Sequence, residues 1–195
     1  MKRRQLKENH LSITSKKDPV LRLHHFAWRC KNAEETRAFY EDILGMPLAH
    51  IIRADVVPST GEYCPYVHLF FKMEDNSYIA FFDLGDDLKA QPSPNTPAWV
   101  NHFAMKLASV EALARFKVRL EQAGVDVLGV TDHGSMQSIY FFDPSGHRLE
   151  LAADTATPDM MKKLDDVKWD MLEEWNKTKR APKHAAWMHE KEFNA

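Results

Sequence analysis

HFAWRC (His25–Cys30) and HFAMKL (His102–Leu107) are two six-residue stretches that share one pattern. Each begins with histidine, phenylalanine and alanine and continues with a large apolar, a basic and a smaller apolar residue. Apolar and aromatic residues at this density predict a β-strand in both places, over 21–30 and over 99–107. A pattern that returns in this way indicates that the chain contains two similar units.

The segments after the two stretches also correspond. A helix follows each one, with Asn32 or Ser109 at the N-cap and Gly45 or Gly124 at the C-terminal end. Strand-like segments then follow at 48–57, 65–73 and 77–84, and again at 125–131, 137–143 and 147–152. We therefore expect an α+β fold: two tandem βαβββ modules that form a curved eight-stranded sheet around a metal cleft, plus a C-terminal helix.

Composition changes divide the chain further. The modules are expected at 21–88 and 98–154, within one domain at 21–154, and the segment between them holds three prolines. Residues 1–20 are expected to form a polar arm. The last part, 155–195, is expected to be a helix and tail, because an apolar stripe follows Thr157. This stripe predicts packing on the body of the protein or on a second subunit, and we expect a homodimer.

Charge and hydropathy exclude several functions. The net charge is −2 and no basic stripe alternates with aromatic residues, which argues against nucleic acid as a partner. No apolar run reaches the roughly 20 residues that a membrane span needs. Two cysteines are too few for a disulfide scaffold, so we expect a cytoplasmic protein.

Three side chains are candidate metal ligands. His25 and His102 occupy the same position in the two units, and Glu150 lies on the last strand of the second unit. If both units curve around one cleft, two imidazoles and one carboxylate meet there. This set is the facial triad of non-haem Fe(II) enzymes that use oxygen, and it also accepts Mn(II) or Zn(II). His24 lacks a histidine counterpart and is interpreted as a structural residue on the opposite face of the strand.

The doubled unit, the segment FYEDILGMPL (39–48) and the segment FFDPSGHRLEL (141–151) resemble the vicinal oxygen chelate superfamily. The resemblance covers residues 21–154. This superfamily includes glyoxalases, extradiol dioxygenases, epimerases and antibiotic-resistance proteins. The resemblance implies that His25, His102 and Glu150 bind a divalent metal, with Fe(II) as the first expectation and Mn(II) as the next.

The same resemblance favours one branch. Ala80 aligns with Glu150, so the fourth ligand that glyoxalases carry in the first unit is missing; His68 and Asp83 remain alternatives for it. Tyr140 lies ten residues before Glu150, the spacing of an active-site tyrosine in extradiol enzymes. His133 is a candidate acid–base residue, although it lies seven residues before Tyr140 where that branch has nine. A core aromatic and an ordinary loop histidine are the alternatives for these two.

The leading hypothesis is therefore a small extradiol dioxygenase. It would act with O₂ on a catechol-like substrate whose two adjacent oxygens bind the metal. A glyoxalase-type lyase or isomerase on the same metal site is the first alternative. A protein that binds a small molecule without chemistry, as some resistance proteins do, is the second.

Overall fold

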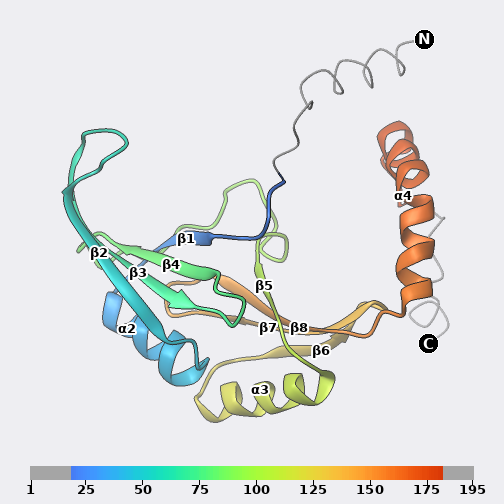
Figure 1. The fold of residues 1–195 in the computed structure, drawn as a ribbon, viewed down its shortest axis with the longest axis horizontal. Coiled ribbons are helices and arrows are strands. Elements are labelled where there is room, and N and C mark those ends of the chain that lie inside the picture. Colours follow the sequence, from blue (N-terminus) through green and yellow to red (C-terminus); the bar gives the residue numbers. More distant parts are fainter. Residues whose placement is uncertain (1–18, 182–195) are drawn as a thin grey trace.

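The computed structural model describes residues 19–181, so the arm at 1–18 and the tail at 182–195 lie outside the described residues. Its elements follow the predicted order twice (Figure 1). The first module consists of β1 (His25–Cys30), α2 (Ala33–Arg37), η1 (Ala38–Ile43), β2 (Leu48–Val56), β3 (Tyr63–Lys72) and β4 (Tyr78–Asp83). The second consists of β5 (Phe103–Lys106), α3 (Val110–Gln122), β6 (Leu128–Asp132), β7 (Met136–Phe142) and β8 (Arg148–Asp154), after which α4 (Pro158–Thr178) begins.

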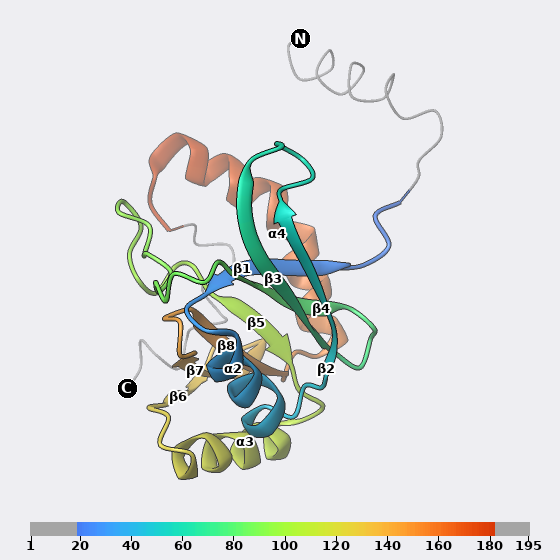
Figure 2. The same ribbon diagram turned by 90° about the vertical axis from the view of Figure 1, so that its left-hand side faces the viewer.

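The eight strands form two sheets of four with the same topology. Their orders are β1-β4-β3-β2 and β5-β8-β7-β6, and in each sheet the first strand runs parallel to the last. The α+β fold of two βαβββ modules is confirmed. Strand pairing stays within each module, so the expected eight-stranded surface is divided into two four-stranded sheets (Figure 2).

Local sequence signals explain the helix ends. The Asn32 carboxamide oxygen accepts hydrogen bonds from the amides of Glu34 and Glu35, both at 3.0 Å. Gly45 ends this helix with a φ of +76°, a left-handed conformation that glycine adopts without strain. Ser109 caps α3 in the same way through the amide of Ala112.

The strand expected from residue 99 begins later than predicted. The amide of Val100 donates to the carbonyl of Pro97 at 3.0 Å, which closes a turn where we expected extended chain. β5 therefore starts at Phe103, and His102 immediately precedes it.

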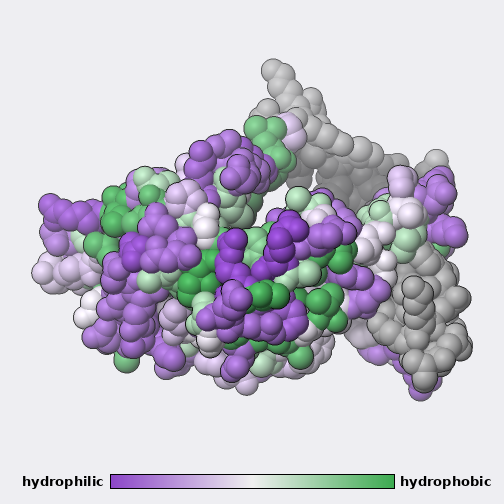
Figure 3. Space-filling model, turned by 90° about the horizontal axis from the view of Figure 1, so that it is seen from below, coloured by the Kyte–Doolittle hydropathy of each residue, from purple (hydrophilic) through white to green (hydrophobic). Residues whose placement is uncertain are grey.

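One hydrophobic core joins the modules. Fully buried aromatic residues of the first module, Tyr40, Phe71 and Phe81, belong to the same cluster as Ile139 and Phe141 of the second. Helices α2 and α3 lie on the same side of the strands (Figure 1). Seen from that side, the surface is mostly hydrophilic, with smaller hydrophobic areas between (Figure 3).

Polar contacts of the DPSG turn reinforce the junction. The buried carboxylate of Asp143 accepts a hydrogen bond from the Tyr40 hydroxyl at 3.1 Å. The Ser145 hydroxyl accepts from the amide of Lys31, and His147 Nε2 contacts the carbonyl of Arg29 at 2.7 Å. Because these bonds cross between modules, the two sheets are held in one fixed orientation.

Helix α4 stands apart at the end of β8 (Figure 1). Thr157 caps it as predicted, but none of its own residues is buried, and Trp169 is 70% exposed. The expected packing of its stripe on the body is therefore not seen, while packing on a second subunit stays a prediction. Among residues 19–181, no helix is long and apolar enough to cross a membrane.

Candidate functional site

Strand register preserves the internal repeat. Ala27 lies opposite Ala80 in the first sheet, and Ala104 lies opposite Glu150 in the second. His25 precedes Ala27 by two residues within β1 and therefore faces the same side of its sheet as Ala80. His102 lies just before β5, and its contact with Glu150 places it on the corresponding side of the second sheet. This side is opposite the shared core in both modules.

His102 and Glu150 form a pair in the second module. His102 Nε2 lies 2.9 Å from a carboxylate oxygen of Glu150, whose residue is only 2% exposed. The other carboxylate oxygen accepts a hydrogen bond from the Ser138 hydroxyl. His102 Nδ1 lies 2.9 Å from the carbonyl of Val100, which can only accept. Nδ1 therefore carries a proton. The contact between Nε2 and the carboxylate is a hydrogen bond that needs a second proton, and a metal ion bound between these two atoms would take the place of that proton.

Tyr140 and His133 form a second pair beside the first. The Tyr140 hydroxyl lies 2.7 Å from His133 Nε2, and its ring lies 5.9 Å from the His102 ring. The Arg148 guanidinium sits over the Tyr140 ring at 4.2 Å. Burial, and then the charge of Glu150, raise the pKa of Tyr140, so the phenol keeps its proton at neutral pH.

His25 lies on the other sheet. Its ring contacts Phe70 at 5.5 Å and His68 at 6.0 Å, measured between ring centroids. The structure thus brings together four of the five candidate residues, His102, Glu150, Tyr140 and His133, and leaves His25 apart from them. Within residues 19–181, no group of three or more histidine, cysteine or acidic side chains is placed to hold a metal ion.

His24 differs from the expectation. β1 begins at His25, so the alternation of a strand does not apply to the residue before it. The two imidazoles meet instead, with their Nδ1 atoms 2.8 Å apart. One Nδ1 must donate to the other, and when His25 is the donor its Nε2 carries the lone pair.

The two alternatives for a fourth ligand have different surroundings. Asp83 accepts hydrogen bonds from the amides of Ala33 and Gly85 and so holds the start of α2. His68 is 8% exposed and stacks on Phe82, with centroids 3.6 Å apart. Burial, reinforced by His25 and His50, lowers its pKa to about 4, so its ring is neutral. Its buried Nε2 has no hydrogen-bond partner within the described chain.

These donor atoms fit a divalent metal. Two atoms 2.9 Å apart, as in His102 and Glu150, can both lie about 2.1 Å from one ion. Ser138 orients the carboxylate and Val100 orients the imidazole, as outer partners do in metal sites. The second module therefore offers one half of a metal site, and His25 in the first module offers another donor.

Two contributors escaped the sequence analysis. Ser138 lies two residues before Tyr140 on the same strand and thus on the same face. Arg148 likewise lies two residues before Glu150. A position two residues away from a candidate in the same strand indicates a shared face, and this signal could have identified both residues. Neither serine nor arginine is specific to a metal site.

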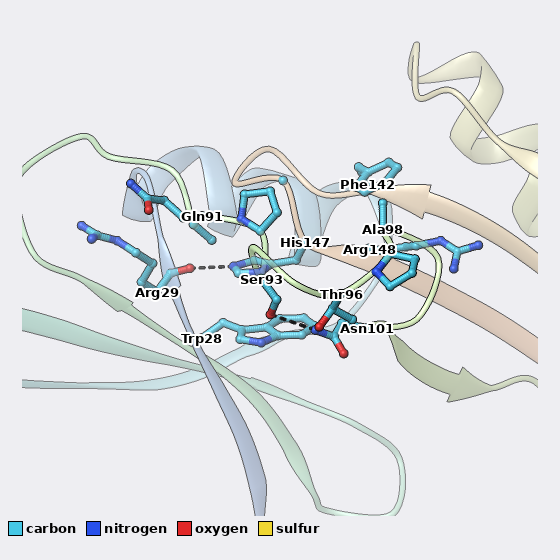
Figure 4. A pocket seen from close by; sticks show the side chains of 14 residues that line it. Trp28, Arg29, Gln91, Ser93, Thr96, Ala98, Asn101, Phe142, His147 and Arg148 are labelled. Carbon is cyan, nitrogen blue, oxygen red and sulfur yellow. Dashed lines mark hydrogen bonds between the residues drawn. The ribbon is translucent and has the colours of Figure 1, made fainter. Parts of the chain in front are cut away.

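A separate cavity of about 390 Å³ lies under the linker between the modules. Figure 4 shows Trp28 and His147 within it, and the rings of these two residues stack at 4.2 Å. Asn101 donates a hydrogen bond to the hydroxyl of Ser93 in the linker, and both residues line the cavity (Figure 4). None of the five candidate residues lines this cavity, but Arg148, which sits over the Tyr140 ring, does, so the cavity adjoins the site described above.

Comparisons with known proteins agree with this fold. The sequence model of the Glyoxalase/Bleomycin resistance protein/Dioxygenase superfamily matches residues 22–151. No curated protein is similar enough in sequence to count as a relative.

Solved structures are similar at low sequence identity. The trypanothione-dependent glyoxalase I of Leishmania major superposes with a TM-score of 0.54 at 18% identity, over 77% of this chain and 97% of that one. A glyoxalase family protein from Enterococcus faecalis gives 0.51 at 24% identity, over 68% and 98%. A glyoxalase/dioxygenase from Nostoc punctiforme gives 0.51 at 20%, over 72% and 100%. At these identities the likeness establishes the fold alone.

Proposed function

Because the chain belongs to the Glyoxalase/Bleomycin resistance protein/Dioxygenase superfamily, we propose that it is a metal-dependent enzyme acting on a small substrate with two adjacent oxygens. The observation that carries this proposal is the pairing of His102 and Glu150 at 2.9 Å, directly beside the hydrogen-bonded Tyr140 and His133. The first pair supplies metal donors, and the second supplies a route for a proton.

The metal would be held between two copies of the chain. His25 and the His102–Glu150 pair lie on different sheets, and the common core fixes these sheets relative to each other. We therefore propose a homodimer in which His25 of one copy completes the site of the other. This arrangement needs no repacking of either core, whereas closure within one chain would break the junction at Asp143.

A bound divalent metal would supply acidity, because it lowers the pKa of a coordinated hydroxyl. The neutral Tyr140 phenol would hydrogen-bond a substrate oxygen next to the metal. His133 would accept the phenolic proton or return it, since its Nε2 lies 2.7 Å from the hydroxyl. The Arg148 guanidinium over the Tyr140 ring would favour negative charge developing there.

Ring-cleaving dioxygenation with Fe(II), or with Mn(II), is the activity that the surroundings favour. The face of β1, β3 and β4 that carries His25 is aromatic around this residue. No carboxylate lies on this face at any of the following strand positions: His25, Ala27, Arg29, Tyr66, His68, Phe70, Lys72, Tyr78, Ala80 and Phe82. Tyr78 and Phe82, which are partly exposed there, suit a flat ring such as a catechol. The absence of a second carboxylate removes the extra base that a lyase or isomerase would use on this face.

Oxygen uptake tests this proposal directly. The protein is loaded anaerobically with Fe(II) or Mn(II) and then given a panel of catechols in air. It should consume one O₂ molecule for each ring opened. Turnover of a hemithioacetal without oxygen uptake would instead assign the site to a lyase. A purified protein that binds small aromatic molecules but retains no divalent metal would contradict the enzymatic proposal altogether.

A further inference from the structure

We propose that His68 on β3 is a fourth metal ligand, so that each module supplies two donors: His25 and His68 from one, His102 and Glu150 from the other. This inference rests on the proposed metal site. Three imidazoles and one carboxylate would then surround the ion.

The internal repeat shows which ligand is missing from the first module and how His68 could replace it. Ala80 occupies the position of Glu150, and a methyl group cannot bind a metal. On the neighbouring strand, Phe70 lies opposite Ala80 as Tyr140 lies opposite Glu150. His68 lies two residues before Phe70 and so corresponds to Ser138, which touches Glu150 in the second module. The first module therefore presents a donor one strand away from the position where the second module has its carboxylate.

The surroundings of His68 point to a missing partner. The residue is 92% buried, since 8% of its surface is exposed, and its Nε2 has no hydrogen-bond partner among the described residues. A buried polar nitrogen without a partner is unfavourable, because it has lost water and gained nothing in return. A metal ion would satisfy that nitrogen.

His25 lies close enough to share an ion with it. The two ring centroids are 6.0 Å apart, with the rings inclined at 68°. With the Nδ1 atom of His25 donating to His24, the Nε2 atom of His25 presents its lone pair to the metal. His25 is exposed and its side chain can turn within its own rotamers, whereas the Phe82 stack fixes the plane of His68.

The donor set has consequences for the metal. Imidazole nitrogen suits Fe, Co, Ni, Cu and Zn, whereas Mg²⁺ and Ca²⁺ prefer oxygen. With three imidazoles against one carboxylate, the protein should discriminate strongly against Mg²⁺ and Ca²⁺.

Cobalt(II) provides a readout that does not depend on activity. Full-length protein labelled with ¹⁵N and loaded with Co(II) should show three paramagnetically shifted imidazole N–H signals, from His25, His68 and His102. His68→Phe retains the ring that stacks on Phe82 and removes both nitrogens. It should show two signals and a Co(II) affinity lower by about tenfold or more. His68→Gln is a second variant that keeps a polar side chain at this position, and it should also lose one signal.

His50→Phe is the matched control, because His50 stands on the adjacent strand and stacks on Phe70 at 4.3 Å. It should keep all three signals and the wild-type affinity. Two signals in the wild-type protein, or wild-type affinity in both His68 variants, would overturn the role of His68 while leaving the metal site intact. An equal loss in His50→Phe would also overturn it, and a wild-type protein that binds no Co(II) would overturn the proposed function as well.

Discussion

The two modules share their topology and register but present different chemistry on the same face. At matched positions the first module has His25, His68, Phe70 and Ala80, whereas the second has His102, Ser138, Tyr140 and Glu150. The histidine at the start of the first strand is common to both. The second module adds a buried carboxylate and the Tyr140–His133 pair, and the first adds aromatic rings and an imidazole whose Nε2 has no hydrogen-bond partner among the described residues.

This difference shows how a repeated unit can divide one site between its copies. On the faces compared, the carboxylate and the Tyr140–His133 pair belong to the second module, which offers only two metal donors, His102 and Glu150. The first module has imidazoles and a surface for a flat ligand, but no anionic ligand on that face. Under the proposed function neither half is sufficient, so metal binding would require the two kinds of face to meet.

Removing the charge of the second module should have the largest effect. Glu150→Gln keeps the size of the side chain and its contact with Ser138, but it loses the anionic donor. We expect affinity for Fe(II) or Mn(II) to fall by about 100-fold or more, measured by calorimetry, and turnover to vanish. Asp154→Asn on the same face of β8 is the control, because Asp154 is exposed and paired with Lys106, and it should bind metal normally.

Mixing two inactive variants should restore part of the metal binding. His25→Ala and His102→Ala each destroy both sites of a homodimer. In a mixed dimer, one of the two sites has both histidines intact: His25 comes from the His102→Ala copy and His102 from the His25→Ala copy. Random exchange makes about half of all dimers mixed, so about one quarter of all sites should recover. Metal content of the mixture after unfolding and refolding measures this. No recovery would show that the two faces meet within one chain.

Tyr140→Phe makes the second module resemble the first at this position, where Phe70 stands. Metal binding should be unchanged, while kcat should fall by about 100-fold because the proton donor is lost. Since the pKa of Tyr140 is raised above its ordinary value of 10.0, activity should decline on the alkaline side only above that pH. The decline should be absent in the variant. An unchanged kcat and pH profile would assign Tyr140 a packing role.

The junction between the modules should affect stability without affecting the site. Tyr40→Phe removes the hydroxyl that donates to the buried Asp143, and we expect a loss of about 1–3 kcal/mol in urea unfolding. Metal affinity should not change. Tyr63→Phe is the control, because Tyr63 is 75% exposed and should not alter stability. A large loss of metal binding in Tyr40→Phe would show that the junction also positions the half-sites.

Local signals in the sequence were sufficient for the fold. Asn32, Ser109 and Thr157 mark helix starts, Gly45 and Gly124 mark helix ends, and alternation along the strands gives the faces. These signals act over a few residues, so a single sequence contains them. The pattern repeated at His25 and His102 also predicted the matched register of the two sheets.

Only the tertiary structure decided where the two faces lie. The separation of His25 from His102 depends on a core that joins Tyr40 and Phe81 to Phe141, contacts between residues far apart in the chain. The meeting of His24 with His25, and the burial of His68 without a partner, depend on the same packing. The sequence around an apolar residue does not show which residues it will pack against, because the hydrophobic effect is non-directional and favours any contact that excludes water. The sequence therefore determined which residues share a face, and packing determined which faces share a site.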